Sequence, residues 1–218
     1  MITAFGGGIL LVAVALELVP EADAGAGPGL TAAGLLAGTL AYVGIDAWLT
    51  RAPSARAMRR SAHAAAAGRS MDMPDHTEAA RGESIAAGLV VDGVPESIAL
   101  GLTVAEGEIG VALLAGVLIG NIVEAYGAAQ PIIAGGHTRR FAVGLMAAIG
   151  AALVVATILG GTVLTTAADS VIGTAQAVAA GAILAAISVS IVPHAFAEVS
   201  SRVALASVAG FIAGYLLS

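Results

Sequence analysis

The chain has 218 residues, of which 58% are hydrophobic and only 11% are charged, and its formal net charge at pH 7 is -6. Soluble domains carry about 25% charged residues, so this composition indicates a protein whose surface faces lipid. The acidic balance argues against nucleic-acid binding, which requires a basic surface. Cysteine is absent, which excludes disulfides and thiolate metal sites; any bound metal is held by oxygen or imidazole groups.

Hydrophobic stretches long enough to cross a bilayer follow one another along the chain. A spanning helix needs about 20 mostly apolar residues, and this rule predicts an all-α, polytopic membrane bundle that forms one transmembrane domain over residues 1–218. The first stretch ends in Val19-Pro20-Glu21 and has no basic segment before it, so it does not read as a cleavable signal peptide. The seven predicted spans cover about residues 2–20, 30–49, 84–105, 109–133, 141–166, 172–197 and 202–217.

Basic residues lie in alternate connections between these spans. Lysine is absent, and every arginine lies in or beside the 51–83 loop, before the fifth span or before the seventh span. Cytoplasmic loops hold the Lys/Arg excess, so the sequence predicts a polar cytoplasmic loop at about 51–83, an N-terminus inside and a C-terminus outside. The arginines are Arg51, Arg56, Arg59, Arg60, Arg69, Arg81, Arg139, Arg140 and Arg202.

Two pairs of spans align with each other. Placing Pro20 on Pro193 matches the first span with the sixth, and placing Glu96 on Glu124 matches the third with the fourth. The members of each pair run in opposite directions in the predicted topology. Inverted repeats with interrupted helices are typical of secondary transporters. Few residues are identical and apolar sequences match easily by chance, so the repeat is a hypothesis.

The third and fourth spans carry polar side chains at membrane depth. Asp92 and Glu96 are four residues apart and share a helix face, and Asn121 and Glu124 share a face of the next span. Charge inside a membrane is costly and marks an ion or substrate path. Two antiparallel neighbours could thus contribute four oxygen ligands to one divalent cation.

The acids also allow other interpretations. Three carboxylates with no basic residue in any span are tolerated if a divalent cation neutralises them or if some are protonated. The alternatives are protonated acids that tie helices together, a proton relay without metal, a proton-coupled transporter of a different cation, and a non-transporting membrane scaffold.

The third span is expected to be distorted next to the acids. Pro95 lacks an N–H and should kink its helix, releasing the carbonyl of Val91, while Gly93 should permit local distortion.

Several polar residues lie nearer the membrane surfaces. Glu17 is predicted on an access path and His194 on an exit path. Asp46, at the cytoplasmic end of the second span, is either an exit-path ligand or a solvated helix end, and Glu21 is expected to be solvated. The 51–83 loop is polar and rich in Ala and Arg, which predicts disorder; weak metal capture by its His, Met and Asp residues is the alternative.

The motifs resemble those of the ZIP (Zrt/Irt-like protein) family of divalent metal transporters. Asp92-Gly93-Val94-Pro95-Glu96-Ser97 is similar to the His-Asn-x-Pro-Glu-Gly type motif of the family's fourth helix, in a form that resembles a bacterial branch. Gly120-Asn121-Ile122-Val123-Glu124 is similar to the motif of its fifth helix. The resemblance implies eight helices with both ends outside, so this chain begins at what would be the second helix; the first is either truncated or dispensable.

The sequence departs from the family where Asp92 replaces the usual ligand His. An all-oxygen site suits Mn, Fe, Mg or Ca as well as Zn, and the resemblance places zinc first. The sixth span offers no acid, so one ion is expected rather than two. The resemblance further implies a homodimer in a bacterial plasma membrane that moves the ion, as substrate, toward the cytoplasm.

Motifs of enzymes are not found. The sequence has no G-x-x-x-x-G-K-[ST] phosphate loop and no H-E-x-x-H zinc motif. Ser190 lies four residues before His194, but serine is common in membrane helices. The sequence therefore predicts a transporter and no enzymatic activity.

Overall fold

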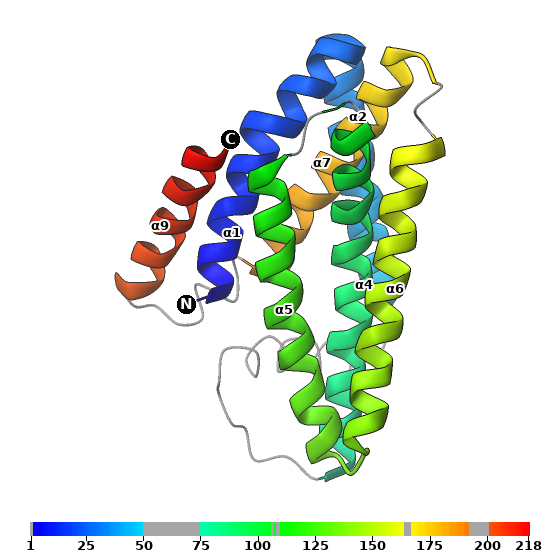
Figure 1. Cartoon of the computed structure of the whole chain (residues 1–218), viewed down its shortest axis with the longest axis vertical. Coiled ribbons are helices and arrows are strands. Elements are labelled where there is room, and N and C mark those ends of the chain that lie inside the picture. The colour runs from blue at the N-terminus through cyan, green and yellow to red at the C-terminus, as the bar shows by residue number, and fades with distance from the viewer. Residues whose placement is uncertain (1, 50–74, 106, 108–109, 164–166, 192–200) are drawn as a thin grey trace.

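The computed structural model describes residues 2–49, 75–105, 107, 110–163, 167–191 and 201–218, and all regular structure among them is helical. Long helices lie side by side in a bundle (Figure 1), which confirms the predicted all-α fold. In chain order the elements are α1 (Ile2–Val12), the π-helical turn η1 (Ala13–Leu18), α2 (Val19–Leu49), α4 (Asp75–Ala105), α5 (Val111–Ala134), α6 (Arg139–Val163), α7 (Asp169–Ala186), the π-helical turn η2 (Ile187–Ile191) and α9 (Ser201–Leu217).

The outward faces of these helices are apolar. Large side chains such as Leu40, Val143 and Leu205 are more than 60% exposed, and apolar surface on this scale marks contact with lipid or with other proteins. Together with their length, this fits a membrane helical bundle. Five described stretches are long and apolar enough to cross a membrane, namely Ala4–Trp48, Ala86–Ala105, Val111–Ala134, Arg139–Val163 and Asp169–Val189, and Arg202–Leu217 is apolar but shorter.

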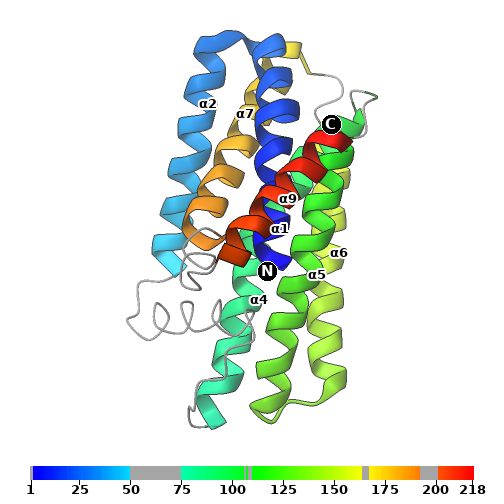
Figure 2. The ribbon, with the colours of Figure 1, turned by 90° about the vertical axis from the view of Figure 1, so that its left-hand side faces the viewer.

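The first stretch contains a sharp break at Gly27. This residue has φ 78° and ψ 164°, a conformation that favours glycine because it has no Cβ. Pro28 then begins the next helical segment, as proline can at a first helical position. The chain reverses here, so that α2 contains the end of one helix and the whole of its antiparallel neighbour (Figure 2).

Helix ends differ from the sequence prediction at two places. The first helix passes Pro20, where the prediction ended it, and reaches the break at Gly27. Proline removes a hydrogen bond to the carbonyl four residues earlier. The π-helical turn η1, directly before Pro20, accommodates the change in hydrogen-bond spacing. Helix α4 begins at Asp75 rather than near residue 84, because hydropathy detects only the apolar part of a helix.

Small residues allow α2 and α7 to pack closely. A Cβ added at Gly38 would overlap the backbone of α7 at Val178, and one added at Gly181 would overlap the backbone of α2 at Leu35. Close approach through small residues is how helices associate where lipid provides no hydrophobic drive. Helix α4 packs against α5 and α6 and also touches α7, so it lies between two groups of helices.

Candidate cation site

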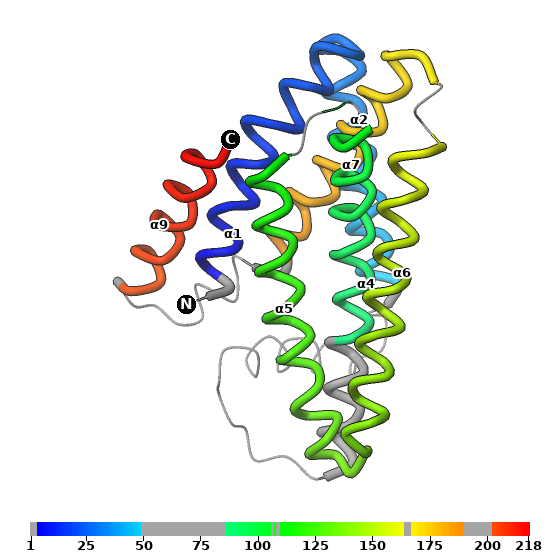
Figure 3. The backbone as a smooth tube through the Cα atoms, viewed as in Figure 1, coloured from blue at the N-terminus to red at the C-terminus, as the bar shows by residue number. Residues whose placement is uncertain are grey.

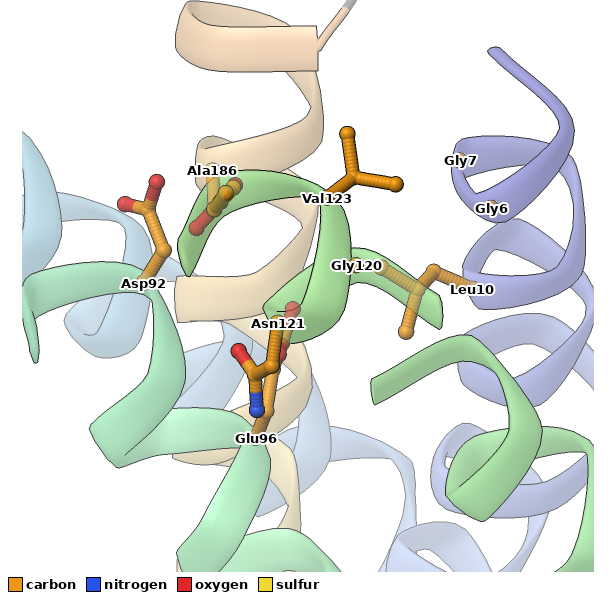
Figure 4. Close-up of a pocket in the computed structure, with 10 residues that line it drawn as sticks. Gly6, Gly7, Leu10, Asp92, Glu96, Gly120, Asn121, Val123 and Ala186 are labelled. Atoms are coloured by element: carbon orange, nitrogen blue, oxygen red, sulfur yellow. The ribbon is translucent and has the colours of Figure 1, made fainter. Parts of the chain in front are cut away.

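The four residues predicted as the main cation site line one pocket. Asp92 and Glu96 come from α4 and Asn121 comes from α5 (Figure 4). Glu124 also lies on α5. The cavity is about 20 Å³, which is room for about one water-sized particle. Its remaining lining is small or apolar: Gly6, Gly7, Leu10, Gly120, Val123 and Ala186.

Burial of the acids is deepest on α4. Asp92 and Glu96 are each 6% exposed, whereas Asn121 and Glu124 are half-buried. The carboxyl groups of Asp92 and Glu124 both lie within electrostatic range of the Glu96 carboxyl group. Three acids therefore share one small, largely apolar environment, and such a cluster favours binding of positive charge.

The side chains do not yet converge on one point. Among the residues that the structure describes, no group of three or more His, Cys, Asp or Glu side chains is arranged to hold a metal ion. In Figure 4 the Asp92 carboxyl group lies apart from the Glu96 and Asn121 side chains. Asp92 instead accepts a hydrogen bond of 2.5 Å from the Tyr42 hydroxyl of α2.

Helix α4 continues through the residues where the sequence predicts distortion. It stays α-helical through Gly93 and Pro95, and the kink at Pro95 stays a prediction. Gly93 meets α6: a Cβ at this position would lie 2.9 Å from Cδ1 of Leu153. Its small size serves helix packing beside the site.

Glu17 contacts the first turn of α5. It lies in η1, is half-buried, and accepts a hydrogen bond of 3.3 Å from the backbone N–H of Leu113. A carboxylate near a helix N-terminus satisfies an unpaired amide and interacts favourably with the helix dipole. The structure thus gives Glu17 a partner at the end of the helix that carries Asn121 and Glu124, and its place on an access path stays a prediction.

Glu21 is not the solvated residue that the sequence predicts. It is half-buried and accepts a hydrogen bond of 3.0 Å from Nε2 of Gln176 on α7. Gln176 is fully buried, and an amide within an apolar span was the sequence signal for this contact. Asp46 is half-buried on α2, one turn after Tyr42, and is not part of the pocket lining. His194 lies outside the described residues.

The fold and the pocket define a class of protein: a helical bundle that fits a membrane, with a buried cluster of acids between two neighbouring helices. No known protein-family description matches the chain, and no curated protein matches it either.

Proposed function

We propose that this chain is a secondary transporter, rather than an enzyme, that moves divalent metal cations toward the cytoplasm. The observation that carries the proposal is one pocket that three acidic residues and one amide from two apolar helices line. Charge at membrane depth is costly unless it serves an ion or substrate path, and a divalent cation would offset the negative charge of the acids. Zinc is the first candidate, by resemblance to the ZIP family, and Mn, Fe, Mg and Ca suit oxygen ligands equally.

The small cavity favours one ion over two. Among the described residues the acidic side chains are not arranged to hold a metal ion, so an ion that enters must draw the carboxyl groups of Asp92, Glu96 and Glu124 toward a common point. The Asn121 amide oxygen adds a neutral ligand from the same pocket. Binding therefore requires rotation of side chains, and we expect it to change the mutual position of α4 and α5.

Helix packing supports an inverted repeat. The alignment of Pro20 with Pro193 places Gly8 on Gly181. A Cβ at Gly8 would overlap the backbone of α9 at Ser207, just as a Cβ at Gly181 would overlap that of α2 at Leu35. Helices α1 and α7 run in opposite directions through the bundle (Figure 3), as the two copies of an inverted repeat must.

The reciprocal contacts extend the repeat to the second helix of each copy. Gly210 of α9 meets the backbone of α1 at Phe5, and Gly38 of α2 meets that of α7 at Val178. The sequences around these glycines agree, with Ala-Gly-Thr-Leu-Ala at 37–41 and Ala-Gly-Phe-Ile-Ala at 209–213. The π-helical turns η1 and η2 also fall at matching positions of α1 and α7. These correspondences support seven spans, with the break at Gly27 separating the first from the second.

Basic residues support the proposed orientation. Helices α6 and α9 run in the same direction (Figure 3), and each begins with exposed arginine, at Arg139 and Arg140 in α6 and at Arg202 in α9. Since the cytoplasmic side holds the Lys/Arg excess, we place these helix starts, and the N-terminus, inside. The bacterial plasma membrane and a homodimer follow from the family resemblance and are part of the proposal.

Reconstitution tests the proposal directly. The purified protein in proteoliposomes should take up at least one of Zn, Mn, Fe, Mg and Ca, and Glu96→Gln and Glu124→Gln should each abolish uptake. The exposed Asp23 of α2 supplies a control: Asp23→Asn changes charge away from the pocket and should transport normally. Full uptake in both pocket variants would place the path elsewhere, and no uptake of any ion by the wild type would favour a scaffold.

A further inference from the structure

Tyr42 lies outside the predicted motifs and contacts an acid of the candidate site. It is 2% exposed, and its hydroxyl donates the 2.5 Å hydrogen bond to Oδ1 of Asp92. A buried carboxyl oxygen needs such a donor, because a buried acceptor without a hydrogen bond is costly. The bond connects α2 to α4, two helices that otherwise touch little.

The Tyr42 ring is held firmly by its surroundings. It packs in a buried cluster with Ala182, Ala185 and Ala186 of α7. One turn earlier, the Thr39 hydroxyl donates a hydrogen bond of 3.1 Å to the Gly181 carbonyl, and glycines hold α2 and α7 in close contact there. The hydroxyl is therefore presented to Asp92 from a fixed position, which is what a group that orients a ligand requires.

The Tyr42–Asp92 pair is absent from the second copy of the proposed repeat. In the register that pairs Gly38 with Gly210, the counterpart of Tyr42 is Gly214, which packs against Ile9 and Val12 of α1. The counterpart of Asp92 in the fourth-span motif is Gly120. Packing of the repeated helices does not need this pair, so its role belongs to the acidic site.

We infer that Tyr42 is a positioning and specificity-determining residue of the cation site, an inference that rests on the proposed function. Its hydroxyl takes one of the two lone-pair positions of Oδ1 of Asp92 and fixes the orientation of the carboxyl group, which favours coordination of an incoming ion through one oxygen over coordination through two. Ca²⁺ takes six to eight oxygen ligands and often uses bidentate carboxylates, whereas smaller ions need fewer ligands. Tyr42 thus biases the site against Ca²⁺ and toward smaller divalent cations.

Tyr42→Phe removes the hydroxyl and keeps the ring. Binding of Zn, Mn and Ca to the purified protein would be measured by competition for wild type, Tyr42→Phe, Asp92→Asn and the double variant. Loss of an outer hydrogen bond to a metal ligand typically costs 10–100-fold in affinity, so Tyr42→Phe should bind Zn and Mn about tenfold more weakly, with a smaller loss or a gain for Ca. Tyr215→Phe, whose side chain is 62% exposed on α9, is the control and should match the wild type.

The double variant distinguishes positioning from general packing. If Tyr42 acts through Asp92, Tyr42→Phe should cause no further change in the Asp92→Asn protein; an equal loss in both backgrounds overturns the inference. Unchanged Zn, Mn and Ca affinities in Tyr42→Phe also overturn it.

Infrared difference spectra provide a test that needs no change at Tyr42. When Mn is added, the wild type should show carboxylate bands that Asp92→Asn lacks. These bands should be those of a carboxylate bound to the ion through one oxygen. Bands of a carboxylate bound through both oxygens would refute the inference. A wild type that binds none of these ions would instead refute the proposed function, so the two failures are distinguishable.

Discussion

Replacing Glu96 by glutamine should change stability in opposite directions with and without a cation. Glu96 and Asp92 are each 6% exposed and lie one helical turn apart, about 6 Å. At an effective dielectric constant of about 20, two unit charges at this separation repel by about 3 kcal/mol. Partial protonation of the two acids lowers this repulsion energy. Because Glu96→Gln removes the repulsion, the variant without cation should be more stable than the wild type by up to about 3 kcal/mol.

The cation reverses the order. A ligand at 100 times its Kd stabilises the folded protein by about 2.7 kcal/mol, which raises Tm by roughly 5–10 °C for a chain of this size. The wild type should gain this stabilisation from the transported ion. Glu96→Gln should gain almost none, because one of the three carboxylates that offset the ion's charge is lost.

Thermal unfolding in detergent, with and without each divalent ion, measures both effects in one experiment. Asp23→Asn serves as the control, since Asp23 is exposed and lies outside the pocket; it should keep the wild-type Tm and the full cation response. A Glu96→Gln protein that is less stable than the wild type without cation, yet keeps the full cation-induced rise in Tm, would refute the assignment of Glu96 to the site.

Three further predictions concern orientation, selectivity and a helix end. A cysteine at Ala64 should be shielded from an impermeant thiol reagent in intact cells and one at Ser218 should react; the opposite labelling would invert the topology. Asp92→His should shift the binding preference toward Zn relative to Mn and lose affinity as pH falls through about 6.5, the ordinary pKa of histidine; an unchanged ranking in competition titrations would exclude Asp92 as a ligand. Glu17→Ala should lower the stability of the fold by about 1 kcal/mol, because the Leu113 N–H loses its acceptor; an unchanged unfolding midpoint would contradict this.

The sequence predicted the pocket because its geometry is local. Residues four or three apart share a helix face, so Asp92 with Glu96 and Asn121 with Glu124 could be paired without knowledge of the fold. Short connections between successive spans then placed the two helices next to each other. In the structure all four residues line one pocket, and their role as cation ligands stays a prediction.

The partners of these residues could not be predicted, because they depend on packing between distant helices. Tyr42 is 50 residues from Asp92 in the chain and Glu17 is 96 residues from Leu113. The role of Gly93 was missed for the same reason: its close neighbour is Leu153 on α6. Hydropathy also placed the start of α4 too late, since it reports the apolar part of a helix and not its full length.

The repeated and unrepeated features of the bundle point to separate roles. The glycine contacts between α1 and α9 and between α7 and α2 occur twice, so they fix the distance between helices and tolerate little change. The Tyr42–Asp92 hydrogen bond occurs once and reaches α4, which packs mainly against α5 and α6. A cation that binds Asp92 beside the Tyr42 hydroxyl therefore acts where two groups of helices meet. For the proposed transporter, this couples occupancy of the site to the relative position of those groups, as alternating access requires.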